Sequence, residues 1–212
     1  MKLYHYWRST SSWRVRWALE HKKIACELVH IHLLNGEAET PAHLARHPLG
    51  FVPVLETNAG ANLIESLAII TYLEDTNPTS PTLFPKDPVE KARALALAEV
   101  INAGTQPLQN IPVLTFYSSD TEKQSTWAQH WIQNGLDLYE KLLPDSILKS
   151  AEPFSVGNRL SIADLFLLPQ LYNAKRYGLG LDPFKKILAI QKHLETLPSY
   201  QKSHPDLYKP AE

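Results

Sequence analysis

Four consecutive hydroxyl residues, Ser9–Ser12, stand where a short apolar strand gives way to a helix near the start of the chain. Val15, Ala18 and Leu19 recur beyond them at helical spacing, so the pattern predicts a helix over 12–22. Charged residues cover the other face of that helix: Arg14, Arg16, Glu20, Lys22 and Lys23. A hydroxyl at a helix start can accept a hydrogen bond from the first N–H groups, and a neighbouring hydroxyl can donate outward. Because the positive end of the helix dipole lies there too, the segment can hold an anion such as a thiolate or a carboxylate.

Two further segments of the first half could bind a small polar molecule. Pro53 opens a predicted strand, and a proline at that place cannot donate to a strand ladder. Ser66 stands where a helix begins, so its hydroxyl and the first free N–H groups could bind a carboxylate. Each feature also fits an ordinary edge proline or an ordinary helix cap.

The elements that must position these residues change character along the chain. Short β-type runs alternate with helical stretches at first, which is typical of an α/β unit. Strands are expected near 2–6, 26–31, 53–57 and 62–65, and helices near 12–22, 39–46 and 66–76. A segment rich in Pro and Thr follows and predicts a linker over 79–87. This divides the chain into a first domain over 1–78 and a second over 88–212.

The second domain reads as helical throughout. One helix is expected to begin at Pro88 and another to run from about Thr121 to Leu143. Ser161-Ile162-Ala163-Asp164 is a capping box with Asp in place of Glu, and it leads into a helix that is apolar on every side. That helix is expected to be the buried centre of the domain.

Composition excludes several classes of protein. The 212 residues carry a net charge of −1, without the basic excess of a nucleic-acid binder. No apolar run approaches the roughly 18 residues of a membrane span, and the start lacks the apolar stretch of a signal peptide. The single cysteine, Cys26, excludes an intrachain disulfide and fits a reducing compartment. We therefore expect a cytoplasmic protein without nucleic-acid or membrane partners.

The segment from Trp7 to Arg16 resembles the active-site segment of zeta-class glutathione transferases, the maleylacetoacetate isomerase family. That family has an aromatic-Arg-Ser-Ser-Cys-Ser-Trp-Arg-Val-Arg segment, which this chain matches in kind at eight of ten positions. Ser11 departs from it, standing where the family usually has cysteine. The resemblance implies the glutathione transferase fold: an N-terminal thioredoxin-like domain with a four-stranded mixed sheet, followed by an all-helical domain. It extends to nearly the whole chain.

The resemblance also implies which residues bind glutathione. Ser9 matches the catalytic serine that donates to the glutathione thiolate, with Thr10 and Ser11 as reserve candidates. Pro53 matches a cis-proline, and the backbone of Val52 before it pairs with the cysteinyl part of glutathione. Glu65 would face the ammonium of the γ-glutamyl end, and Ser66 its carboxylate.

Other implied contacts are less well defined. Gln109, in a segment that matches the family's Gln-Pro-Leu-Gln-Asn, would reach glutathione within the subunit or across an interface. Phe51 stands where the family often has glutamine, so an amide contact with glutathione is absent there. His32 and Arg46 are possible substitutes for that amide.

The implied reaction is glutathione-dependent cis–trans isomerisation of maleylacetoacetate to fumarylacetoacetate, by thiolate addition, rotation and elimination. Arg8, beside the hydroxyl run, would assist catalysis and hold the substrate. Gln106 would line the acceptor pocket, and Arg176 would bind a substrate carboxylate. A homodimer is expected from the family.

Alternatives remain open. Ser11 is compatible with a zeta-like transferase that acts on other electrophiles such as α-halo acids. Maleylpyruvate isomerases are close relatives, although they tend to carry histidine at the position of Gln106. A non-catalytic glutathione-binding module is the third alternative. The pairs His30/His32 and His43/His47 have spacings that could bind zinc, but no cysteine or clustered carboxylate completes a site, and we expect no metal.

Overall fold

A computed structural model of the protein describes residues 1–210. Packing divides the chain into two units. The first holds Met1–Thr82 together with the residues from Pro198 onward, and the second holds Leu83–Leu197. Their elements differ in kind, because every strand found in the described residues lies in the first unit.

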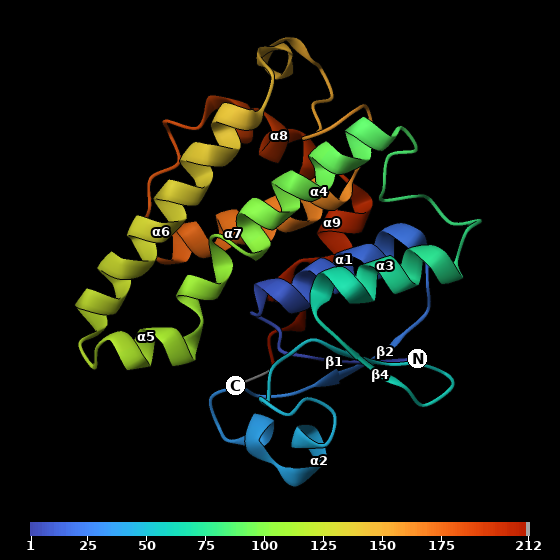
Figure 1. Ribbon diagram of the computed structural model, residues 1–212, viewed down its shortest axis with the longest axis vertical. Helices are drawn as coiled ribbons and strands as arrows, with labels where there is room; N and C mark the ends of the chain where they lie inside the picture. Colours follow the sequence, from blue (N-terminus) through green and yellow to red (C-terminus); the bar gives the residue numbers. More distant parts are fainter. Residues whose placement is uncertain (211–212) are drawn as a thin grey trace. The chain divides into compact units, whose positions relative to one another are not determined.

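The first unit is built on a four-stranded mixed sheet (Figure 1). Its strands are β1 (Lys2–His5), β2 (Glu27–His30), β3 (Val54–Glu56) and β4 (Asn62–Ile64), in the order β2-β1-β3-β4. β1 runs parallel to β2 and antiparallel to β3, which in turn runs antiparallel to β4. The predicted four-stranded mixed sheet is confirmed, with all strands within two residues of their expected bounds.

Helices cover both faces of this sheet. α1 (Thr10–Lys22) and α3 (Ser66–Thr76) pack together on one face, and α2 (Pro41–Leu44) lies on the other (Figure 1). The helix expected over 39–46 is shorter than predicted: Thr40 caps α2, and a 3-10 turn, η1 (Glu37–Glu39), precedes it. The proline at the first position of α2 accounts for this division, since it favours a helix start there.

The charged face predicted for the first helix is not a solvated face. Arg14 is 0%, Arg16 1% and Lys22 3% exposed. Each finds acceptors inside the unit, which is why burial of the charge is tolerated. The Arg16 guanidinium donates to the carbonyls of Tyr6 and Trp7 and lies 3.0 Å from Nδ1 of His5. α1 is therefore a central helix of the unit, buried on nearly every side.

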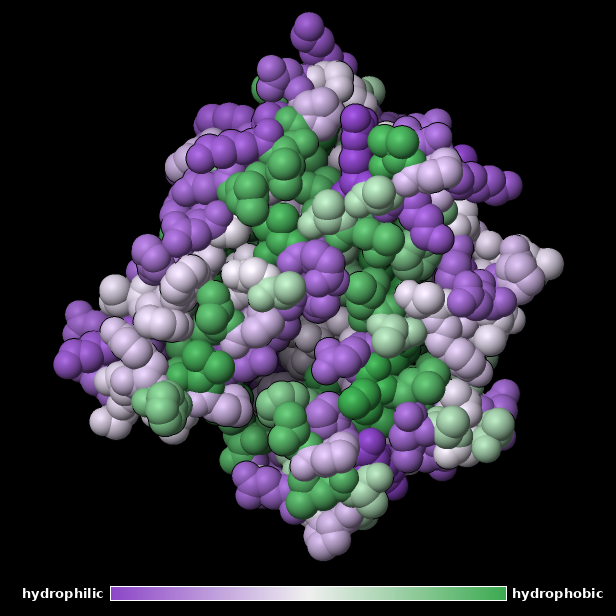
Figure 2. All heavy atoms as spheres, viewed as in Figure 1, coloured by the Kyte–Doolittle hydropathy of each residue, from purple (hydrophilic) through white to green (hydrophobic). Residues whose placement is uncertain are grey.

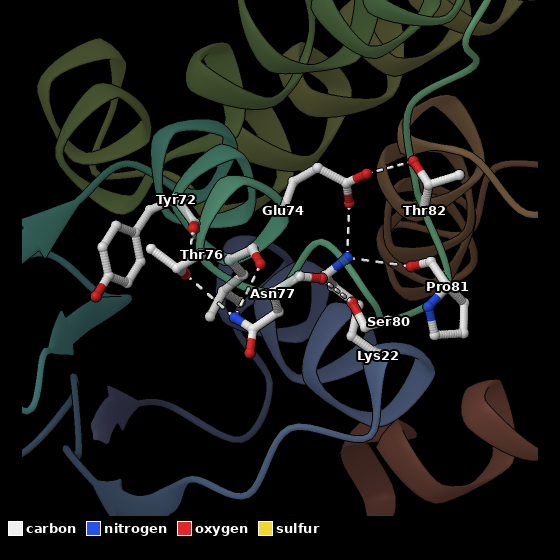
Figure 3. A network of polar contacts seen from close by, with 9 residues as sticks. Lys22, Tyr72, Glu74, Thr76, Asn77, Ser80, Pro81 and Thr82 are labelled. Atoms are coloured by element: carbon white, nitrogen blue, oxygen red, sulfur yellow. Dashed lines mark hydrogen bonds and ion pairs between the residues drawn. The ribbon is translucent and has the colours of Figure 1, made fainter.

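Figure 3 shows the contacts between Lys22 and the first part of the predicted linker. Its Nζ lies 2.7 Å from a carboxylate oxygen of Glu74 and donates to the carbonyl of Pro81 over 3.1 Å. The hydroxyl of Thr82 donates to the same carboxylate. Residues up to Thr82 consequently pack with the first unit, four residues beyond the boundary predicted at 78.

The C-terminal segment also packs with the first unit, whereas the sequence predicted one helical domain over 88–212. The segment contains α9 (Pro198–Ser203) and a 3-10 turn, η4 (Pro205–Tyr208). The indole nitrogens of Trp13 and Trp17 donate over 3.1 Å to the hydroxyls of Ser203 and Ser199. These bonds join α9 to α1. The predicted end of the second domain, at 212, lies outside the described residues.

The regular elements found in the described residues of the second unit are all helices and 3-10 turns. The unit contains α4 (Pro88–Asn102), α5 (Ile111–Tyr117), α6 (Thr121–Leu142), α7 (Ile162–Arg176), α8 (Lys185–Leu194) and the 3-10 turns η2 (Gln106–Gln109) and η3 (Asp145–Lys149). α7 packs against α4 and α6 and buries twelve of its fifteen residues, as predicted for the central helix.

The capping box of α7 forms as expected. Ser161 donates to the Asp164 carboxylate from its backbone N–H over 2.9 Å and from its hydroxyl over 3.0 Å. Ser155 N–H donates to the other carboxylate oxygen over 2.8 Å. Complete burial raises the pKa of Asp164 despite these donors. Among the described residues, none of the helices combines the length and the apolar character needed to cross a bilayer.

A groove of about 780 Å³ lies in the helical unit between α4, the end of α6 and the segment around η3. It is lined by apolar residues that include Leu97, Leu143 and Phe154, and by charged residues that include Arg93 and Lys141. In Figure 2 apolar residues gather over this part of the unit. None of the predicted site residues lines the groove.

Candidate functional site

Ser9 is the N-cap of α1. Its hydroxyl oxygen accepts from the backbone N–H of Ser12 over 3.2 Å, which satisfies one of the free donors at the helix start. Accepting a hydrogen bond leaves the hydroxyl proton available to an outside acceptor. The geometry therefore combines a hydroxyl donor with the positive end of the helix dipole of α1, a pair suited to an anion.

The neighbouring hydroxyls differ in accessibility. Thr10 is 8% exposed and Ser12 is fully buried, whereas Ser9 and Ser11 are half-buried. Arg8, also half-buried, places its guanidinium carbon 5.5 Å from the ring centre of Trp7. Of the reserve candidates, Ser11 is the more accessible to a ligand.

The peptide bond between Val52 and Pro53 is cis, as the resemblance implied. The ladder between β1 and β3 ends at Val54, so the backbone of Val52 lies beyond the paired part of the strand. His43 lies behind this turn, with Nε2 3.0 Å from the carbonyl oxygen of Phe51, and burial lowers the pKa of its imidazole. An extended ligand could add to the strand at Val52.

Glu65 and Ser66 meet at the start of α3. Glu65 is exposed and has φ 66°, a conformation that non-glycine residues rarely adopt. Ser66 is 3% exposed, and its hydroxyl oxygen accepts from Nη1 of Arg14 over 3.2 Å. The buried guanidinium of Arg14 thus adds positive charge at the N-terminal end of α3. The backbone strain lies at Glu65, next to it.

His32 and Arg46 were suggested as substitutes for the glutamine that the family often has at the position of Phe51. The two side chains make different contacts. The imidazole of His32 accepts from Leu34 N–H over 3.2 Å, and its backbone N–H donates to Glu37 over 2.7 Å. Arg46 stacks on the ring of Tyr4, at 4.1 Å from the ring centre. Phe51 is 37% exposed and lies against His47. Which of these residues contacts a ligand stays a prediction.

The remaining predicted site residues belong to the helical unit. Gln106 is half-buried and donates to the side chain of Asn110 over 2.7 Å. Gln109 is 6% exposed, and its amide forms a cluster with the amides of Gln170 and Asn173. Arg176 is exposed at the end of α7, and its Nη1 donates to Oδ1 of Asn173 over 2.8 Å.

Two features of these sites escaped the sequence reasoning. One is Arg14 behind Ser66, and the other is the amide cluster that Asn173 joins to Arg176. A signal for the first was present, because Trp13, Val15 and Trp17 alternate with the arginines and leave α1 no polar side. The amide cluster had no comparable signal, since amides in a helix are usually solvated.

The histidine pairs and the single cysteine bear on metal binding and on thiol chemistry. Among residues 1–210, no group of three or more His, Cys, Asp or Glu side chains is arranged to hold a metal ion. Cys26 is half-buried just before β2, and burial raises the pKa of its thiol, which disfavours the reactive thiolate.

Comparison with known proteins accounts for both units. Residues 1–75 match the family model of the glutathione S-transferase N-terminal domain, and residues 108–202 match that of the C-terminal domain. Probable maleylacetoacetate isomerase 1 of Drosophila melanogaster is 42% identical over 206 residues, which cover 96% of this chain and 80% of that protein.

Solved structures agree. The holo structure of a bacterial maleylpyruvate isomerase, a zeta-class glutathione S-transferase, has a TM-score of 0.91 and 33% identity, and the match covers all of both chains. Maleylacetoacetate isomerase from Anaeromyxobacter dehalogenans 2CP-1, with glutathione bound in the active site, has a TM-score of 0.84 and 40% identity, over 97% of this chain and 94% of that one. The chain therefore belongs to the zeta-class glutathione transferase and maleylacetoacetate isomerase family.

Proposed function

We propose that this protein is a glutathione-dependent cis–trans isomerase that converts maleylacetoacetate to fumarylacetoacetate. The observation that carries the proposal is the hydroxyl of Ser9, which caps α1 as an acceptor and keeps its proton for a ligand. The identity of about 40% with proteins named maleylacetoacetate isomerase, over 96% or more of the chain, supports the choice of reaction.

In this proposal, residues of the first unit contact glutathione along its whole length. The helix start at Ser66, with Arg14 behind it, suits the γ-glutamyl carboxylate, and exposed Glu65 suits the adjacent ammonium. The backbone of Val52 before cis-Pro53 suits the cysteinyl amide. These contacts would leave the thiol to Ser9, with Ser11 as the alternative donor.

When bound, glutathione supplies a thiolate that adds reversibly to the substrate's double bond. A free thiol has a pKa of about 8.5, so only a few per cent is ionised at neutral pH. Each unit by which the site lowers this pKa corresponds to about 1.4 kcal/mol of preference for the thiolate. The Ser9 proton and the helix dipole of α1 together supply one to two such units in this proposal.

We assign two arginines and one glutamine to the acceptor substrate. Its carboxylates and the negative charge that develops on its carbonyl oxygen need cationic partners. Arg8 beside the hydroxyl run and Arg176 at the end of α7 are assigned to them, and Gln106 is assigned to the pocket wall. Gln109 is a candidate glutathione ligand whose amide is already engaged within the helical unit.

We further propose that the enzyme is a homodimer of the cytoplasm and serves tyrosine catabolism. The family supports the dimer and the pathway, and the single free cysteine fits a reducing compartment. Maleylpyruvate isomerase is the second candidate, favoured by the TM-score of 0.91 with such an enzyme. A third candidate function is the transfer of glutathione to electrophiles such as α-halo acids, with which Ser11 in place of the family's cysteine is compatible.

The test is glutathione-dependent turnover of maleylacetone by the wild type, Ser9→Ala and Ser11→Cys. The proposal predicts isomerisation by the wild type and a loss of at least about 100-fold in Ser9→Ala, with Ser11→Cys active. Maleylpyruvate and an α-chloro acid are assayed in parallel. Tight glutathione binding without turnover of maleylacetone would refute the isomerase assignment, and preference for either other substrate would select that alternative.

A further inference from the structure

His43 is a buried histidine of the first unit, and its side chain contacts the segment that precedes Pro53. It belongs to the short helix α2 and is 1% exposed. Its Nε2 lies 3.0 Å from the carbonyl oxygen of Phe51. Val52, the next residue, is half-buried and carries the backbone groups assigned above to the cysteinyl part of glutathione. A buried side chain therefore holds the peptide group beside a proposed ligand contact.

The carbonyl of Phe51 decides which form of the imidazole is present. A carbonyl oxygen can only accept, so Nε2 of His43 must carry the proton and donate it. Nδ1 of the same ring is buried and has no hydrogen-bond partner within residues 1–210. A second proton would stand on that nitrogen without an acceptor, and burial together with the nearby charge of Arg46 lowers the pKa of the ring. The imidazole is thus a neutral donor with one fixed direction.

Peptide geometry carries this restraint from Phe51 to Val52. The carbonyl of Phe51 and the N–H of Val52 belong to one planar group, and this peptide bond is trans. In a trans peptide the carbonyl and the N–H point in opposite directions. Because the carbonyl points to the buried imidazole, the N–H of Val52 points away from His43. The bond from His43 therefore fixes the direction in which Val52 can donate.

The helix that carries His43 is itself fixed by local contacts. The N–H of His43 donates to the carbonyl of Thr40 over 3.0 Å, and the Thr40 hydroxyl also accepts from it over 3.4 Å. Pro41 stands at the first position of α2, where its fixed φ suits a helix start. The carbonyl of His43 accepts from the N–H of His47 over 2.9 Å. These bonds set the position from which the imidazole reaches Phe51.

The segment between His47 and Phe51 follows a path that brings the Phe51 carbonyl to the imidazole. The N–H of Leu49 donates to Nδ1 of His47 over 3.2 Å, and the N–H of Gly50 donates to the His47 carbonyl over 2.8 Å. Gly50 has φ 67°, and a Cβ there would lie 2.6 Å from the carbonyl oxygen of Ala38. Only glycine fits such a position without displacing Ala38. The backbone just before Phe51 is thus held in place as well.

We propose that His43 is a positioning residue for glutathione: it holds the Phe51–Val52 peptide so that the N–H of Val52 donates to the carbonyl of the cysteinyl residue. The inference rests on the proposed function, which assigns the backbone of Val52 to that part of glutathione. His43 itself does not touch the ligand in this account. A neutral donor suits the task, because a charged side chain buried at this position would need a counter-ion.

Three variants separate the donated hydrogen bond from the bulk of the side chain. In His43→Gln the amide nitrogen reaches about as far from the backbone as Nε2 of histidine and also donates without charge. His43→Leu fills a similar volume but leaves the carbonyl of Phe51 without its partner. His21→Leu is the matched control, since it removes a half-buried imidazole of the same unit, in the last turn of α1.

The test measures by calorimetry the dissociation constant of glutathione for the full-length wild type and these variants. His43→Leu is expected to weaken binding by at least about fivefold, because the unpaired carbonyl lets the peptide turn. His43→Gln and His21→Leu are expected to stay within about twofold of the wild type. The inference is wrong if His43→Leu binds like the control, or if His43→Gln binds as weakly as His43→Leu.

A pair of smaller thiols tests the proposed bond of Val52. γ-Glutamylcysteine amide retains the cysteinyl carbonyl, whereas γ-glutamylcysteamine lacks that amide group. The wild type should bind the first at least about fivefold more tightly, and this ratio should drop below about twofold in His43→Leu. A general defect of the fold would leave the ratio unchanged. An unchanged ratio in His43→Leu would therefore refute the positioning of Val52.

These binding measurements do not depend on turnover. A wild type that shows the ratio, loses it in His43→Leu and does not isomerise maleylacetone would refute the proposed reaction and support the inference. Isomerisation by the wild type together with an unchanged ratio in His43→Leu would do the opposite. Melting temperatures identify a variant that fails to fold. If His43→Leu fails, His43→Asn replaces it with the same expected results, because the shorter amide does not reach the Phe51 carbonyl.

Discussion

Nη1 of Arg14 donates to the hydroxyl oxygen of Ser66 over 3.2 Å, although 52 residues separate the two in the chain. Arg14 is fully buried, so its charge acts in a medium of low effective dielectric and is felt strongly at the start of α3. The bond also turns the hydroxyl proton of Ser66 away from the guanidinium. A carboxylate at this helix start would meet both the proton and the charge.

Removal of this guanidinium is expected to weaken glutathione binding. Arg14→Met should raise the dissociation constant of glutathione by about tenfold or more, because a charge-assisted interaction with a carboxylate contributes about 1.5–3 kcal/mol. Calorimetric titration measures it, and Arg159→Met, an exposed arginine of the helical unit, is the control. Unchanged affinity in a folded Arg14→Met protein would show that the charge plays no part in binding.

The lowered pKa of the His5 imidazole is expected to make the free energy of unfolding depend on pH. Burial and the charge of Arg16 lower its pKa to about 3, from 6.5 in the unfolded chain. Between these values the unfolded state binds the extra proton, so this contribution to stability is complete above pH 6.5 and is lost as the pH falls toward 3. The expected slope approaches about 1.4 kcal/mol per pH unit in that window.

Urea unfolding of the wild type and His5→Gln between pH 4 and pH 7 measures that slope. The variant should lose less stability on acidification than the wild type, because Gln does not titrate. His130→Gln, at an exposed position on α6, should follow the wild type. Parallel curves for wild type and His5→Gln would contradict the assignment.

The Lys22–Glu74 pair predicts a large loss of stability on disruption. The Lys22 side chain is 1% exposed, so Glu74→Ala would leave its buried charge without the carboxylate partner. The free energy of unfolding should fall by about 3–5 kcal/mol. The exposed pair of Lys2 and Glu27, at 3.8 Å, offers a control, and Glu27→Ala should cost less than about 1 kcal/mol. Equal free energies of unfolding for the two variants would contradict this difference.

A side chain at position 135 is expected to clash within the helical unit. Gly135→Ala places a methyl group against Thr105 and should destabilise the protein by about 1–3 kcal/mol through overpacking. Gly180→Ala, where a Cβ would meet nothing within 4 Å, is the control. A melting temperature of Gly135→Ala equal to that of the control would contradict the close contact.

Much of the fold could be predicted because it depends on local pattern. The bounds of α3 and the capping box of α7 follow from short-range spacing, and both formed as expected. Where partners come from distant parts of the chain, prediction failed. The burial of Arg14, Arg16 and Lys22 depends on acceptors that the folded chain brings to α1, and the return of α9 depends on two serines that meet two indoles.

The candidate site divides in the same way. The hydroxyl run, the cis peptide and the helix start at Ser66 belong to motifs that the sequence resemblance could identify. Arg14 behind Ser66 and Asn173 beside Arg176 are supports that only three-dimensional packing makes visible. Such supports carry no motif of their own, because any side chain with the right donor or acceptor could serve.

The central claim is that the Ser9 hydroxyl holds glutathione as a thiolate. The most direct measurement is a pH titration of the ultraviolet absorbance of the thiolate in complexes of glutathione with the wild type, Ser9→Ala and Ser11→Ala. The account predicts a thiol pKa at least about one unit higher in Ser9→Ala than in the wild type and Ser11→Ala. Equal pKa values in wild type and Ser9→Ala, or a rise confined to Ser11→Ala, would contradict it.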